Sequence, residues 1–385
     1  MALQDIVRGK GVGVIDPHGD LVERLLTFIP KRRVPDTIYL DASAPIPIDF
    51  MHCKDDKERD SLADDLYVLF QAFSESSGER MNSILRRLIP TLLSVPGTTF
   101  LDIHDFLAHE ERRRQILSSL RNKELHAYWT KQFPHLPKDS AMPILSRMAK
   151  FVITPSLRAM LGEAHPKLDI FEAMEQRKIL LINLAKVGKE SGTLLGKLFV
   201  SKIQQAAMRR QIQDPTYRIP FYLYVDEFQN FQTSAFDVIL SEAGKYRLCL
   251  TLAHQYVDQL DKKIRASIFG NVSTFILFRL SEADARLFRG EVRFYDSVED
   301  EYVPLRPEDL TALRKGRAVY RSVSGEASYI RTPSPPRTPI SNYAELIKNR
   351  TIEQYSCQRL AEPLKSAHDE PQPTGRPTWI SPHQS

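Results

Sequence analysis

Ile219-Pro-Phe-Tyr-Leu-Tyr-Val-Asp-Glu-Phe-Gln-Asn-Phe231 is an apolar run that ends in the acid pair Asp226-Glu227. The run from Phe221 to Val225 is typical of a strand covered on both faces, as in parallel sheets. Ligands of such sheets bind beyond the carboxyl ends of the strands. An aspartate there can hold Mg²⁺, directly or through water, while the next glutamate orients a water for attack on a phosphoryl group. Because acids also follow strands that simply reach solvent, the dipeptide alone leaves both interpretations open.

Strands and helices alternate on both sides of this stretch. Gly11 to Asp16 reads as a strand, a helical pattern follows from Leu21, and Thr37 to Asp41 reads as a second strand. Later apolar runs extend the alternation, at Lys178–Leu184, Leu248–Leu252 and Val272–Phe278. We therefore predict the α/β class, with a core of roughly six or more mostly parallel strands. Two later strands around Ser324-Gly325 are expected to form a hairpin.

Residues 54–175 have a helical period almost throughout. Roughly a hundred helical residues exceed what one crossover needs, so this segment is predicted to be an inserted all-α domain. The predicted divisions are 1–53 and 176–331 for the two parts of the ATPase-like core and 54–175 for the insert. Residues 332–385 are predicted to be a Pro-rich linker, one helix near Tyr343 to Cys357, and a disordered tail. Within the insert, Arg112-Arg-Arg114 is either a solvated helix face or a phosphate contact.

Composition limits the class of protein. The chain has 385 residues, 42% of them hydrophobic and 26% charged, which is typical of a soluble globular protein. No apolar stretch approaches the ~18 residues of a membrane span, so no span is expected. The three widely separated cysteines suit reduced thiols, and we expect a cytoplasmic location. A formal charge of +5 permits a polyanionic partner such as DNA without demanding one.

Polar residues follow three of the predicted strands: Asp16-Pro-His18, Asp226-Glu227 and Ala253-His254-Gln255. Because parallel strands end at one edge of a sheet, these groups are expected to converge on a nucleotide site. Gln255 suits a sensor of the terminal phosphate, since its amide can both donate and accept. His254 is better interpreted as structural. A metal at His18 with Asp16 and Asp20 matches no ligand set that we can defend.

The phosphate-binding part of such a site is missing from the sequence. There is no G-x-x-x-x-G-K-[ST] in the chain, and Gly192-Thr-Leu-Leu-Gly196-Lys197-Leu198 has too few residues between its glycines and lacks the hydroxyl. That segment also follows the wrong strand and falls inside an amphipathic helix. A loop of backbone N–H groups that could cradle phosphates is therefore not predicted.

Several separated motifs resemble the TraG/TraD-type coupling proteins of type IV secretion and conjugation, within the HerA/FtsK group of ATPases. They are Val14-Ile-Asp-Pro-His-Gly-Asp20, Phe221 to Gln229, Leu240-Ser-Glu-Ala-Gly-Lys-Tyr246 leading into Leu252-Ala-His-Gln255, Gly270-Asn-Val, and Phe278-Arg-Leu-Ser-Glu-Ala-Asp284. The resemblance extends over about residues 3–331 and includes a helical insert of the kind that the family calls its all-alpha domain.

The resemblance implies a P-loop NTPase-like core with an inserted all-α domain. It also implies a homo-oligomeric ring, a hexamer, that hydrolyses ATP to move single-stranded DNA toward a secretion channel at the cytoplasmic face of the inner membrane. On that pattern Asp226 would serve Mg²⁺ through water, Glu227 would serve the attacking water, and Asp16 and Gln255 would contact ATP. Relaxosome or secretion-channel proteins would be the partners. The helical domain would face DNA or docking proteins.

The sequence departs from the family pattern in two ways. The family's phosphate loop would come just before Met1, which suggests an N-terminally truncated member. Gly244 also stands where an arginine acting on a neighbouring subunit is expected, and Arg247 or Lys245 would have to replace it. The leading hypothesis is therefore a coupling-protein ATPase core that is inactive by itself, with its status as an enzyme undecided. The alternative is a non-enzymatic module that docks DNA or a relaxosome protein through the all-α domain.

Overall fold

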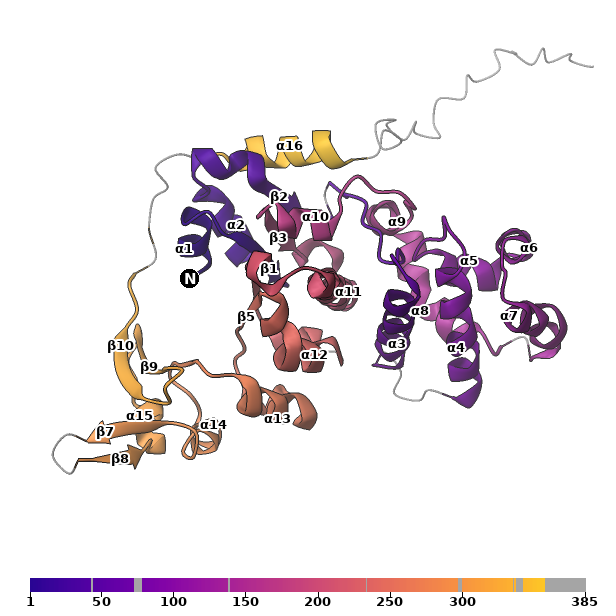
Figure 1. Ribbon diagram of the computed structural model, residues 1–385. Coiled ribbons are helices and arrows are strands. Elements are labelled where there is room, and N and C mark those ends of the chain that lie inside the picture. The colour runs from indigo at the N-terminus through magenta and orange to yellow at the C-terminus, as the bar shows by residue number, and fades with distance from the viewer. Residues whose placement is uncertain are drawn as a thin grey trace, which may run out of the picture.

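The computed structural model describes residues 1–356, except 43, 73–77, 138, 233, 297–299, 335 and 337–341. Its centre is a parallel sheet of five strands in the order β2-β3-β1-β4-β5 (Figure 1). All residues of β1, β2 and β3 are buried, as expected for strands with helices on both faces. The predicted α/β class with a parallel core is confirmed. The strands are β1 (Gly11–Asp16), β2 (Thr37–Leu40), β3 (Ile179–Asn183), β4 (Phe221–Val225) and β5 (Leu248–Leu252).

One predicted strand of this sheet lies elsewhere. The apolar run 272–278 contains only the short strand β6 (Phe275–Leu277), which pairs antiparallel with β9 (Arg317–Arg321) in a separate three-stranded sheet. The prediction of a sixth parallel strand was wrong, because an apolar run fixes burial but not which neighbour a strand pairs with. The hairpin around Ser324-Gly325 is confirmed, since β9 pairs with β10 (Ala327–Arg331). A further hairpin joins β7 (Arg293–Asp296) to β8 (Glu301–Pro304).

All but the last of the helices between β2 and β3 lie together on one side of the sheet (Figure 1). Apolar contacts continue from the sheet through α11 (Lys189–Met208) and α3 (Asp56–Ala72) into this group. The assignment of 54–175 as a separate domain stays a prediction. The other helices of the group are α4 (Glu79–Leu93), α5 (Asp102–Ala108), α6 (Glu110–Ser118), α7 (Lys123–Ala127), a π-helical turn (Tyr128–Gln132), α8 (Met142–Ile153) and α9 (Pro155–Leu161). The last helix before β3, α10 (Ile170–Glu175), contacts α11 and β1 instead.

The remaining helices cover the sheet or join the later strands. α1 (Ala2–Val7) and α2 (Asp20–Thr27) flank β1, and α12 (Ser234–Glu242) follows β4. α13 (Lys262–Asn271), α14 (Glu282–Leu287) and α15 (Pro307–Thr311) lie toward the antiparallel strands (Figure 1). None of the helices described combines the length and the apolar character that crossing a bilayer requires.

A C-terminal helix, α16 (Ala344–Tyr355), packs against β2, the edge strand of the parallel sheet (Figure 1). The backbone N–H of Tyr39 donates to Oγ1 of Thr351 over 3.2 Å, and Lys348 lies over the Tyr39 ring at 5.2 Å. The helix therefore covers an edge that would otherwise be open to pairing with another strand. The sequence predicted this helix but not its position. The predicted disordered tail, from residue 357 onward, lies outside the described residues.

A carboxyl group lies in the contact between α3 and α11. Burial raises the pKa of Asp65 to about 6, and Nε2 of Gln205 lies 3.5 Å from its Oδ2. Because this pKa is raised above the ordinary 3.8, Asp65 is protonated in both the folded and the unfolded chain below about pH 4 and does not lower the free energy of unfolding there. The penalty grows as the pH rises to about 6 and then stays, at up to about 3 kcal/mol.

Asp65→Asn is therefore expected to raise the free energy of unfolding at pH 7.5 by as much as about 3 kcal/mol. It should have little effect at pH 4. Denaturant unfolding at the two pH values measures the difference. Asp60→Asn, which changes an exposed acid on the same helix, is the control and should leave stability nearly unchanged. Equal effects of Asp65→Asn at both pH values would contradict the assigned burial penalty.

Candidate nucleotide site at the carboxyl edge

Three neighbouring strands place their carboxyl ends side by side. In the parallel register Ile15 lies opposite Val225, and Val225 lies opposite Leu252. Asp16 therefore ends β1 next to Asp226, which follows β4, and Gln255 follows β5 on the other side. Strand order alone thus places the acid pair between the other two predicted site residues.

The carboxylate of Glu227 is held by two amide side chains. Nε2 of Gln255 donates to its Oε1 over 2.6 Å, and Nε2 of Gln229 donates to its Oε2. The backbone of Glu227 is left-handed, with φ at 45° and ψ at 47°, a conformation that costs a residue with a side chain roughly 1–3 kcal/mol. This turn ends β4 abruptly and holds the carboxylate at the sheet edge, where it can accept a proton or orient a water.

Asp226 lies among negatively charged groups. Its backbone N–H donates to the carbonyl of Ile15, so its position is set by the sheet. Half-burial raises the pKa of its carboxyl above the ordinary value, and the neighbouring charges of Asp16 and Glu227 raise it further. A bound cation would offset both effects. The residues present therefore fit a divalent cation at Asp226, held directly or through water.

Asp16 has a local structural task. Its side chain is buried, and its oxygens accept the backbone N–H of His18 over 2.9 Å and that of Val22 over 3.1 Å. It therefore ties the turn after β1 to the first turn of α2. Contact of Asp16 with ATP stays a prediction.

His254 lies beside the site as an uncharged, packed side chain. Burial lowers the pKa of its imidazole, and its ring lies 5.5 Å from that of Phe228. Since the ordinary pKa is already near 6.5, His254 is neutral at pH 7. It is a packed side chain, in agreement with the structural interpretation.

Lys245 and Arg247 are not brought to this edge. Arg247 comes directly before β5, whereas Gln255 comes after it, so the two lie at opposite edges of the sheet. Arg247 is exposed, has φ at 57°, and its carbonyl accepts the N–H of Phe221. Within one chain neither cation can contact the Glu227 site. A role for either one on a neighbouring subunit stays a prediction.

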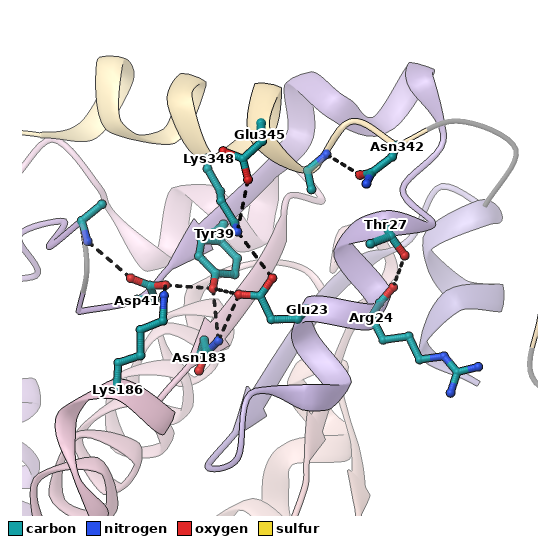
Figure 2. A network of polar contacts seen from close by, with 12 residues as sticks. Glu23, Arg24, Thr27, Tyr39, Asp41, Asn183, Lys186, Asn342, Glu345 and Lys348 are labelled. Carbon is teal, nitrogen blue, oxygen red and sulfur yellow. Dashed lines mark hydrogen bonds and ion pairs between the residues drawn. The ribbon is translucent and has the colours of Figure 1, made fainter. Parts of the chain in front are cut away.

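Sequence reasoning missed a polar network beside the site (Figure 2). The hydroxyl of Tyr39 donates to Glu23, lies 2.9 Å from Asp41, and accepts Nδ2 of Asn183 over 3.1 Å. Lys186 pairs with Asp41 over 3.0 Å, while Lys348 of α16 reaches Glu23 over 3.5 Å. Burial raises the pKa of the Tyr39 hydroxyl well above its usual range. Asn183 and Asp41 also follow buried strands, so the signal that found Asp16 could have found them.

Comparison with known proteins identifies the segment that contains the site. Residues 220–288 match the family model described as the TraM recognition site of TraD and TraG. This segment is similar to the TraG/TraD-type coupling proteins. The match begins at β4 and includes Asp226, Glu227 and Gln255, so the predicted resemblance is confirmed over the stretch that carries the site. No curated protein sequence matches the chain.

Solved structures of coupling proteins share the fold over most of this chain. The unbound bacterial conjugative coupling protein TrwBΔN70 is 14% identical with a TM-score of 0.61, covering 89% of this chain and 81% of that one. Plasmid coupling protein TrwB in complex with ADP and Mg²⁺ gives the same identity and TM-score, with 89% and 82% covered. VirB4 of Thermoanaerobacter pseudethanolicus is 13% identical with a TM-score of 0.53, covering 87% and 84%. At these identities the likeness establishes the fold.

Proposed function

We propose that this chain supplies the Mg²⁺- and water-handling half of an ATP-hydrolysing site in a DNA-translocating coupling protein of type IV secretion. The observation that carries the proposal is the Glu227 carboxylate, held by the Gln229 and Gln255 amides next to a half-buried Asp226 at the carboxyl edge. The complex of TrwB with ADP and Mg²⁺ supports the same ligand class for this chain.

The proposed roles follow from position. Asp226 would hold Mg²⁺, which when bound neutralises charge on the phosphates. Glu227 would orient the attacking water, because its carboxylate is fixed yet still has lone pairs to accept a proton. Gln255 would link the water-positioning group to the terminal phosphate through its neutral amide.

A homo-oligomeric ring would allow Lys245 or Arg247 to reach the site of a neighbouring subunit. Measuring the mass of the assembly in solution tests for such a ring. The proposed location is the cytoplasm.

Weak Mg-ATP binding is the expected behaviour of the purified 385-residue chain, because its sequence contains no glycine-lysine phosphate loop. Titration calorimetry with Mg-ATP and phosphate release with single-stranded DNA measure binding and turnover. Any turnover present should fall about 10²–10⁴-fold in Glu227→Gln. Glu282→Gln, which changes an exposed acid paired with Arg286, is the control. Micromolar Mg-ATP binding would contradict the expected weakness, and full turnover in Glu227→Gln would contradict the role of Glu227.

Docking without catalysis is the second candidate, and the family model favours it because its description is a TraM recognition site. Tyr256, Phe278 and Leu287 are exposed apolar side chains within the matched segment and would suit a protein partner. In the helical group, by contrast, Arg112 is hydrogen-bonded to Asp102, Arg113 to the Phe106 carbonyl, and Arg114 to Glu110. These internal partners make the arginine run a poor phosphate-binding surface.

A binding comparison separates the two functions. A module that only docks should bind a relaxosome protein of the TraM class and show no DNA-stimulated turnover. A motor component should bind single-stranded DNA with an affinity that falls steeply as salt rises. The absence of DNA binding at low salt would count against the motor.

A further inference from the structure

Two histidines and an aspartate meet at the corner between α5 and α6, away from the carboxyl-edge site. His104 and Asp105 belong to α5, and His109 is the extended residue between the two helices. Nδ1 of His104 lies 2.9 Å from Oδ1 of Asp105, and Nε2 of His109 lies 3.9 Å from the same oxygen. One ligand atom from each residue lies within 4.8 Å of the other two.

These separations are close to those of a metal centre. Ligands at about 2.1 Å in a tetrahedral site lie about 3.4 Å from one another, so each atom needs to move by only about 1 Å. The two imidazole rings are 6.0 Å apart between centroids and inclined by 66°, which leaves room for both to face one ion. The helix break makes this arrangement, since residues 104 and 109 are five apart and would diverge on a continuous helix.

We propose that His104, Asp105 and His109 bind a divalent cation of the Zn²⁺ class. Two imidazoles and one carboxylate favour Zn²⁺ or Co²⁺ over Mg²⁺ and Ca²⁺, which take oxygen ligands almost exclusively. Three protein ligands leave the remaining position to water or to another side chain. Glu111 lines the same hollow as Asp105 and His109 and offers such a carboxylate, whereas Glu110 is paired with Arg114.

The charges around the corner are compatible with a cation. The guanidinium of Arg112 lines the same hollow, but its N–H groups donate to Oδ1 of Asp102 over 2.6 Å and to Oε1 of Gln115 over 2.8 Å, so part of its charge is offset by Asp102. The side chains of Asp105 and His109 are 34% and 64% exposed, so an ion can reach them from solvent, while that of His104, at 18%, is held more firmly.

The bound ion would clamp the corner. The N–H of His109 already donates to the carbonyl of Asp105, and the guanidinium of Arg113 donates to the carbonyl of Phe106 across the same junction. A third link through the metal would hold α6 at one angle to α5. We therefore expect Zn²⁺ to raise the melting temperature by several degrees when it is present well above its Kd.

The test uses the full chain without an affinity tag, treated with chelator and then titrated with Zn²⁺ by calorimetry in excess Mg²⁺. One Zn²⁺ per chain is expected, and His104→Ala, His109→Ala and Asp105→Asn should each weaken binding at least about tenfold. His126→Ala and His135→Ala change exposed histidines of the same helical region and should leave it unchanged. Visible absorption of the Co²⁺-loaded chain reports the coordination directly, including in a variant that melts at a lower temperature.

Three results would overturn the proposal. They are no Zn²⁺ binding by the unmodified chain, Zn²⁺ affinity in the His104→Ala and His109→Ala variants equal to that of the unmodified chain, or displacement of Zn²⁺ by Mg²⁺. In the first case His104 would only hydrogen-bond to Asp105, and His109 would only lie nearby. In the second the ion would sit elsewhere on the chain.

Discussion

Arg210→Ala is expected to lower the free energy of unfolding by about 3–5 kcal/mol, because it removes one partner of a buried ion pair. The side chain of Arg210 is 0% exposed, and its Nε donates to Oε1 of Glu175 over 2.8 Å. Its Nη1 donates to the carbonyl of Tyr246 over 2.9 Å. The substitution would leave Glu175 without its cation and would remove one of the contacts that hold the turn before β5.

The consequence reaches the proposed functional residues. Lys245, Tyr246 and Arg247 form the turn that leads into β5, so losing the Tyr246 contact should loosen the two cations proposed to act on a neighbouring subunit. Denaturant unfolding measures the stability change, and proteolysis at Lys245 and Arg247 reports the turn. Arg286→Ala is the matched control, since its pair with Glu282 is exposed and worth little. Similar losses from Arg210→Ala and Arg286→Ala would contradict the argument.

Gly196→Val is expected to destabilise the chain by about 3 kcal/mol or more, because an overpacked core cannot relax around it. A Cβ at Gly196 would lie 2.2 Å from Cε1 of Phe231, a ring that is fully buried. Phe231 ends the 3₁₀ turn that follows Glu227, so α11 and the site segment approach each other at this glycine. The substitution should also displace Gln229 and weaken its hydrogen bond to Glu227.

A pair of alanine substitutions separates packing from helix propensity. Gly270 lies in α13, where an added Cβ would meet no other atom within 4 Å, so Gly270→Ala should be neutral or stabilising by up to about 1 kcal/mol. Gly196→Ala gains the same propensity but meets Phe231, so it should destabilise. Melting temperatures of the two variants make the comparison. Equal shifts for the pair would show that the Phe231 ring moves aside without cost.

Much of the site could be predicted because it follows from strand ends. Asp16 ends its strand, and Asp226 and Gln255 follow theirs within three residues, so parallel pairing presents all of them at one edge of the sheet. The clamp on Glu227 could not be predicted in the same way. Gln229 is two residues beyond Glu227, and it reaches back only because the backbone turns left-handed at Glu227.

The near match to a phosphate loop shows what residue spacing cannot decide. Gly192 and Gly196 lie inside α11, where their lack of a side chain allows close approach to Leu184 and Phe231. The two glycines whose spacing resembles a phosphate loop are therefore positions where α11 packs closely against its neighbours. The corner at His109 is a parallel case, since His104 and His109 converge only because one helix ends and another begins between them.

The sequence by itself determined the parallel α/β core, the helical run between its strands and the polar groups that end them, because hydrophobic period and strand-end polarity are local properties of the chain. Tertiary structure decided which strands are neighbours. β6 pairs with β9 and not with the parallel sheet, and α16 packs against β2 although the two are far apart in sequence. Such pairings depend on which surfaces of the other elements are still uncovered, and the local sequence around Asp226 or Tyr39 does not determine this.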